Sequence, residues 1–253
     1  SLYCTAPYPS GFGSHVNRKR VSAGLFQFSR PDLCFLAFLY VVFWDVWDTI
    51  TPMSQVMNEQ GEKKTVELIL ASASPRRREL LARAGYEFTV QPPALDEPNR
   101  MAAGLPPAQY AESLAYFKAR SVSERNTHAC VLGADTIVVS ADGRILGKAG
   151  NPDEARQMLK DLSHRPHTVI TGIALVGPGD RRLLDSDVTR VTMRPMNEQD
   201  IEEYIASGEW EGKAGAYAIQ ESADKFVINL DGSFTNVVGL PMELIERLLA
   251  ANT

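Results

Sequence analysis

The 253-residue chain has ordinary globular composition, with 44% hydrophobic and 23% charged residues, which fits one domain or one domain with an extension. Its formal net charge of −5 disfavours a generic nucleic-acid-binding protein, because such proteins are usually basic, and no nucleic-acid partner is expected. The three cysteines have no paired spacing and form neither a disulfide framework nor a zinc site, so a reducing, cytoplasmic setting is expected.

Residues 1–64 differ in composition from the rest and are predicted to be an N-terminal extension, either disordered or translated from upstream sequence. The first 50 positions hold 11 of the 21 aromatic residues, and a basic segment precedes twelve consecutive apolar residues at 33–44. This layout resembles a signal peptide, but twelve residues are fewer than the roughly 18–20 that span a bilayer. A membrane anchor is therefore the less favoured interpretation, no membrane partner is expected, and Met53 or Met57 would be the natural start.

Residues 65–253 alternate between strand-like and helix-like segments, which predicts one α/β domain with a mixed sheet flanked by helices. Strands are expected at 66–71, 86–91, 131–132, 137–140, 145–146, 168–176 and 183–193. Helices are expected at 76–84, 108–125, 197–207 and 242–251, with another that begins at Asn151. Near the C-terminus, segments 225–230 and 234–238 lie on either side of a turn at 231–233.

The turn after the first of these strands has the pattern of a phosphate site. A strand-like run ends at Ser72 and Ser74, and Pro75 then stands where a helix can begin. The N–H groups of a first helical turn bind anions, and Arg76 and Arg77 add forked positive donors. The alternative is an exposed basic helix start with a serine cap.

Other polar residues follow apolar segments, where α/β proteins tend to bind ligands. They are Asp96 and Glu97 in a proline-rich loop, Asp135 and Thr136, Lys148, and segment 213–220 with its Gln220, while Lys118 lies on the long expected helix. Taken singly, most of them could be solvated, capping or turn residues. Together, carboxylates for a hard divalent cation and cations for phosphate oxygens predict a metal-dependent nucleotide site. No GxxxxGK[ST] run is present, so the chain is not a P-loop protein.

Five motifs in this order resemble the Maf family of nucleoside triphosphate pyrophosphatases over about residues 66–253. They are ASASPRR at 71–77, LGADT at 132–136, GK at 147–148, KAGAYAIQ at 213–220 and NVVGLP at 236–241. The resemblance implies a two-lobed Maf/ITPase-like fold with a mixed sheet and a cleft between the lobes. It also implies hydrolysis of a nucleoside triphosphate to the monophosphate and pyrophosphate with a divalent cation, Mg²⁺ or Mn²⁺.

The resemblance also assigns roles to individual residues. Asp135 matches the proton acceptor, with Glu97 and Asp135 at the metal and Ser72, Arg77, Lys118 and Lys148 at the phosphates. Arg76, Thr136 and Gln220 match the positions that separate the subgroups, and they indicate the dTTP/UTP subgroup. Glu221 departs from the family's usual glycine and places a carboxylate beside Gln220. Whether Asp135 acts as a base or mainly as a metal ligand stays open.

The implied role is removal of unwanted nucleotides from the pool. The alternatives are a pyrophosphatase acting mainly on modified nucleotides and a non-catalytic nucleotide-binding regulator, for example of cell division. The complete set of charged site residues argues against the loss of catalysis. A homodimer is an open alternative to a monomer.

Overall fold

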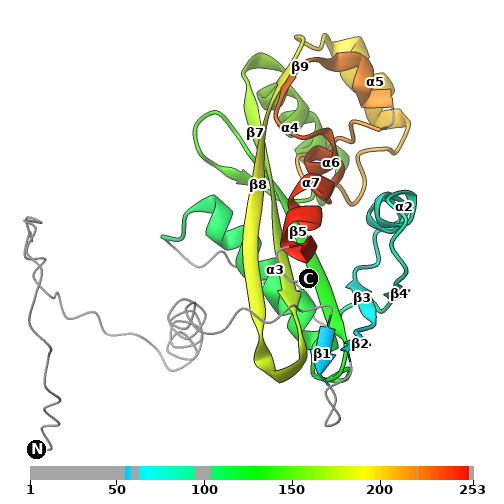
Figure 1. Ribbon diagram of the computed structural model, residues 1–253. Coiled ribbons are helices and arrows are strands. Elements are labelled where there is room, and N and C mark those ends of the chain that lie inside the picture. Colours follow the sequence, from blue (N-terminus) through cyan, green and yellow to red (C-terminus); the bar gives the residue numbers. More distant parts are fainter. Residues whose placement is uncertain (1–54, 58–62, 95–103, 221, 251–253) are drawn as a thin grey trace, which may run out of the picture. The chain divides into compact units, whose positions relative to one another are not determined.

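The computed structural model describes residues 55–57, 63–94, 104–220 and 222–250, all of which belong to one compact unit, Ile50–Thr253 (Figure 1). The apolar run at 33–44 and the pair Asp96 and Glu97 lie outside the described residues. Strands β1 (Gln55–Met57) and β2 (Lys63–Thr65) pair antiparallel, and all of their residues except Thr65 belong to the segment predicted as an extension. The boundary between residues 64 and 65 stays a prediction.

The main sheet has seven strands and is mixed (Figure 1). Its strands are β3 (Leu68–Ala71), β4 (Thr89–Val90), β5 (Cys130–Val139), β6 (Ile145–Leu146), β7 (His167–Val176), β8 (Arg182–Met193) and β9 (Val227–Asp231). Their order is β4-β3-β5-β7-β8-β9, with β6 paired to β5. β3 runs parallel to β4 and β5, whereas β6, β7, β8 and β9 pair antiparallel with their neighbours. This confirms the expected mixed sheet.

The described part of the chain contains six helices, of which five begin within one residue of the expected start, whereas the helix at 234–238 was not expected. They are α2 (Pro75–Arg83), α3 (Pro107–Ser123), α4 (Pro152–His164), α5 (Glu198–Ala206), α6 (Phe234–Val238) and α7 (Met242–Ala250), with short 3₁₀ turns at Pro178–Asp180 and Ser222–Phe226. The side chains of Ser74, Asn151 and Asn197 each accept the main-chain N–H of the third helical residue, which satisfies a donor that the helix itself cannot pair.

One expectation about the sheet is wrong. The pattern predicts two short strands on either side of residues 133–136, but β5 is continuous from Cys130 to Val139. The cause is long-range pairing, because β7 pairs with every residue of β5 from Val131 to Val139. Asp135 therefore lies inside a strand and not in a turn. The strand expected at 86–91 is also shorter, since β4 spans only Thr89–Val90.

Helix α3 packs closely on β5 and β7 because both strands carry a glycine beneath it. A Cβ on Gly133 would lie 2.2 Å from the carbonyl oxygen of Ala115, and a Cβ on Gly172 would lie 2.2 Å from the carbonyl carbon of Ala111. Such contacts are far inside van der Waals distance, so the two glycines set the height of α3 above the sheet. They thereby also set the position of Lys118, which α3 carries.

The hydrophobic core consists of two main clusters that share β5. One joins Val138 to the buried faces of α4 and α5, including Leu159, Leu162 and Ile201. The other joins Leu132 and Ala134 to α2 and α7, including Leu81, Leu244 and Ile245. Asp135 and Thr136 lie on β5 between the two clusters, so a polar site is held by packed apolar residues on both sides. No helix in the described part of the chain is long and apolar enough to cross a membrane.

Candidate active site

A cavity of about 670 Å³ lies where β5 lacks a strand neighbour on one edge. On this edge β5 pairs with β3 as far as Gly133 and with β6 from Val138. The cavity lies against the interval between these two pairings. Seven of the predicted site residues line it: Ser72, Arg76, Arg77, Lys118, Asp135, Thr136 and Lys148.

Two predicted site residues are not placed in this wall. Glu97 lies outside the described residues. Gln220 is exposed and is not among the described residues that line the cavity, although its neighbour Ile219 is. The role of Gln220 in base selection therefore stays a prediction.

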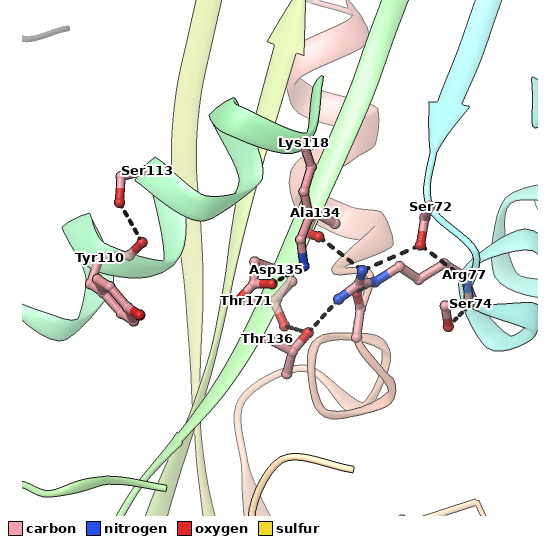
Figure 2. A network of polar contacts seen from close by, with 11 residues as sticks. Ser72, Ser74, Arg77, Tyr110, Ser113, Lys118, Ala134, Asp135, Thr136 and Thr171 are labelled. Carbon is pink, nitrogen blue, oxygen red and sulfur yellow. Dashed lines mark hydrogen bonds and ion pairs between the residues drawn. The ribbon is translucent and has the colours of Figure 1, made fainter. Parts of the chain in front are cut away.

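Asp135 and Lys118 form an ion pair in the cavity wall. The residue Asp135 is 7% exposed, and its Oδ1 accepts from the Lys118 Nζ (Figure 2). Pairing lets the protein keep a carboxylate at a buried position, where an unpaired charge would be costly. Within the described part of the chain, Oδ2 of Asp135 accepts no hydrogen bond, so this oxygen remains for a water molecule or a cation. The pair was not foreseen, since the resemblance places Lys118 at the phosphates.

Arg77 joins three elements around the cavity. Its Nε donates to the carbonyl oxygen of Gly239 (2.8 Å), and its Nη1 donates to the carbonyl oxygen of Ala134 (2.8 Å). Its Nη2 donates to Oγ1 of Thr136 (3.0 Å), and Ser72 Oγ lies 3.4 Å from Nη1 (Figure 2). The guanidinium thus binds the start of α2 to β5 and to the end of α6. Its structural role is larger than the sequence predicts.

A second wall of the cavity comes from the segment 211–219. Lys148 pairs with Ala214 in an isolated antiparallel bridge, and the Gly215 N–H donates to the Gly147 carbonyl oxygen (3.0 Å). Lys213, on the same segment, also lines the cavity. It lies within one of the recognised motifs, but the sequence alone assigned it no role.

A buried aromatic pair supports this second wall. Tyr217 lines the cavity, and its hydroxyl lies 2.8 Å from Nε2 of His167, which is 1% exposed. Burial lowers the pKa of His167 to about 4 and raises the pKa of Tyr217, so both side chains are neutral at pH 7. Sequence reasoning missed His167, because a single histidine at the start of a strand carries no distinctive signal.

The charges in the cavity are mostly positive. Arg76, Arg77, Lys118, Lys148 and Lys213 line it, against the carboxylates of Asp135 and Glu211. A cationic cavity in a protein with net charge −5 focuses a local field that attracts anions. The fold and the site together define an α/β protein that binds a phosphorylated ligand.

The chain belongs to the Maf-like protein family. The family described as "Maf-like protein" matches residues 67–252, which is most of the chain. This covers the main sheet, its helices and all of the described cavity residues.

Relatives at 42–50% identity are named "dTTP/UTP pyrophosphatase". The protein of Moorella thermoacetica is 50% identical over 185 residues, covering 73% of this chain and 94% of the relative. That of Pelotomaculum thermopropionicum is 42% identical over 184 residues, covering 72% and 95%, and that of Gloeobacter violaceus is 47% identical over 186 residues, covering 74% and 96%. Among solved structures, a HAM1 protein from Coxiella burnetii aligns with a TM-score of 0.41 at 18% identity, covering 74% of this chain and 99% of that chain.

Proposed function

We propose that the protein hydrolyses nucleoside triphosphates, dTTP and UTP above all, to the monophosphate and pyrophosphate, and so clears the nucleotide pool. The observation that carries this proposal is the buried Asp135–Lys118 pair in the wall of a cavity lined by further cations. The names of the relatives supply the reaction and the pyrimidine substrates.

In the proposed reaction, Oδ2 of Asp135 takes a proton from a water molecule. The water oxygen forms a bond to the α-phosphorus, and the bond from that phosphorus to the α–β bridging oxygen breaks, so the bridging oxygen leaves with pyrophosphate. A positioned general base contributes typically about 10²–10⁴-fold to such a rate. Lys118 holds the Asp135 carboxylate in place through Oδ1.

Charge stabilisation falls to the cations of both walls. Arg76 lies in the first turn of α2, where main-chain N–H groups and the helix dipole favour an anion. Lys148, which pairs with Ala214 of the second wall, also lines the cavity. Arg77 and Ser72 are proposed to contribute mainly by fixing the wall, since the hydrogen bonds of Arg77 described above run to protein groups, Ser72 among them.

The described residues fit a divalent cation only in part. They contain no cluster of three or more histidine, cysteine or carboxylate side chains that could hold a metal ion. However, Mg²⁺ commonly takes one or two carboxylates together with substrate phosphate oxygens, and Asp135 Oδ2 would provide one such oxygen if Asp135 acts as a metal ligand in place of the base. Glu97 is the second candidate ligand from the sequence. When bound, Mg²⁺ or Mn²⁺ would neutralise phosphate charge.

The test is a panel of nucleoside triphosphates with Mg²⁺ or with a chelator, assayed for both pyrophosphate and monophosphate. We expect pyrophosphate release from UTP and dTTP that the chelator abolishes. Release of inorganic phosphate alone would contradict the proposed bond cleavage. Nucleotide binding without pyrophosphate release would favour the non-catalytic regulator, and faster turnover of 5-modified uridine triphosphates would favour the modified-nucleotide enzyme.

A further inference from the structure

The main chain of Thr136 points to the open edge of β5. Along a strand, the N–H and C=O of one residue point to the same edge, and successive residues alternate. Three contacts identify that edge: Cys130 N donates to Glu67 O (2.8 Å), Ala134 O accepts from Arg77 (2.8 Å), and Ser140 N donates to Arg144 O (2.9 Å). Residues 130 and 134 are even positions of the continuous strand β5, and Ser140, which directly follows its last residue, keeps the same alternation, so Thr136 points the same way.

Within the described strand β5, Thr136 is the residue on this edge that lines the cavity and has no partner on a neighbouring strand. β3 pairs only as far as Gly133, β6 pairs only from Val138, and Arg77 occupies the carbonyl of Ala134. Thr136 lines the cavity and is half-buried. One donor and one acceptor of the main chain therefore stand side by side at the cavity wall, as on the edge of an unfinished sheet.

The hydroxyl of Thr136 has no proton left for a ligand. The single hydroxyl proton of Thr171 goes to the carbonyl oxygen of Asn236 (3.0 Å). Across the 3.0 Å contact between the two threonine hydroxyls, Thr136 must therefore donate (Figure 2). Arg77 Nη2 donates to the same oxygen of Thr136. Because Thr171 and Asn236 are fully buried, this arrangement is fixed by the fold.

We propose that the main chain of Thr136, and not its side chain, reads the base. Its N–H donates to O4 of uracil or thymine, and its C=O accepts from N3–H. In the same position, cytosine would place its C4 amino donor against the Thr136 N–H and its N3 acceptor against the Thr136 C=O, so both contacts would be repulsive. O2 is present in both bases and does not distinguish them. A phosphate could use the N–H, but its oxygens would face the carbonyl. The inference rests on the proposed function, and it makes the Thr136 side chain a positioning group.

The decisive variant replaces the Thr136 peptide N–H with an ester oxygen, by incorporating the α-hydroxy acid that keeps the threonine side chain. Leaving hydrogen-bonding groups unpaired or opposed changes affinity by roughly 5- to 150-fold, so we expect the UTP/CTP ratio of kcat/KM to fall by that amount. Thr136→Val is the matched control, because it keeps the main chain and removes the hydroxyl. It should lower both kcat/KM values together and keep their ratio within about threefold.

A substrate pair tests the inference on the unaltered protein if either variant fails to fold. 4-Thio-UTP weakens the proposed acceptor and should lower kcat/KM roughly 2- to 13-fold, whereas 2-thio-UTP should match UTP. Equal effects of the two thio substitutions on kcat/KM would overturn the inference. A Thr136→Val variant that loses the preference for UTP over CTP, while the ester variant keeps it, would also overturn it. A wild-type enzyme that releases pyrophosphate without preferring UTP over CTP would also overturn it and leave the pyrophosphatase standing. If no triphosphate yields pyrophosphate, the proposed function fails, and calorimetric affinities for UTP and CTP then decide the inference.

Discussion

The two walls of the cavity are stabilised in different ways. The wall of α2 and β5 is held by Arg77, whose guanidinium bonds to Gly239, Ala134 and Thr136. The wall of residues 211–219 is held by the β-bridge at Lys148, by the buried Tyr217–His167 contact and by the Tyr204 hydroxyl, which accepts from the Ala218 N–H (3.3 Å). Charged, forked bonds to main-chain carbonyls fix geometry strongly. The first wall is therefore suited to placing reacting groups, and the second wall depends on neutral contacts that pH and small substitutions can weaken.

The largest expected effect is on the first wall, at Asp135. Asp135→Asn is nearly isosteric but removes the proton acceptor, so kcat should fall by about 10²–10⁴-fold. Nucleotide affinity, measured by calorimetry, should largely survive. Asp153→Asn is the control, because Asp153 is exposed on α4 and is not among the described residues that line the cavity. Near wild-type turnover in Asp135→Asn would remove the proposed mechanism.

A second test of the first wall is Arg77→Lys, which keeps the charge and loses the fork. Hydrogen bonds from charged groups contribute about 1.5–3 kcal/mol each, and a lysine cannot make all of those seen here. We expect a loss of roughly 2–4 kcal/mol in the free energy of unfolding, measured by urea denaturation. Arg78→Lys, at the exposed next position, should change stability by less than about 0.5 kcal/mol. Equal losses of stability in the two variants would show that the Arg77 hydrogen bonds do not hold this wall.

The contrast between the walls also shows what the sequence could predict. Helix starts follow from signals within a few residues, so the starts of α2, α4 and α5 were predicted to within one residue. The continuity of β5 depends on its pairing with residues of β7 that lie 29 to 45 positions further along, which no local pattern contains.

Seven predicted site residues line the cavity, but their mutual contacts were not predicted. The bond from Arg77 to Gly239 joins positions 162 residues apart, and the Lys118–Asp135 pair depends on the height of α3 above the sheet. A list of charged residues predicts the chemistry of a site. Which of them bind each other is decided by packing, here by Gly133 and Gly172.

The second wall should respond to pH through His167. Its pKa in the folded protein is about 4, below the ordinary value of 6.5, because burial disfavours the charged ring. The unfolded chain therefore binds a proton more readily between these values, and stability should fall as pH drops from about 6.5 to about 4, by roughly 3 kcal/mol in total. Above pH 6.5 this contribution should be constant. Denaturation at a series of pH values checks it, and the same slope in His167→Gln would assign the effect to other groups.

The smallest expected effect concerns the backbone of the second wall at Ala216. Its φ of 59° is in the left-handed region, which costs a non-glycine residue about 1–2 kcal/mol. Ala216→Gly should relieve this strain, but it also removes a fully buried methyl group and adds freedom to the unfolded chain. These terms nearly cancel, so we expect a change of at most about 1 kcal/mol in the free energy of unfolding.

Ala218→Gly is the matched control, because Ala218 is buried in the same segment and is not among the positive-φ positions of the described chain. Ala218→Gly should lower the free energy of unfolding, because no backbone strain is relieved there. The difference in unfolding free energy between the two variants, about 1 kcal/mol, measures the strain at Ala216. If Ala216→Gly costs as much as Ala218→Gly, the left-handed residue stores no strain, and the second wall is firmer than the comparison with the Arg77 wall suggests.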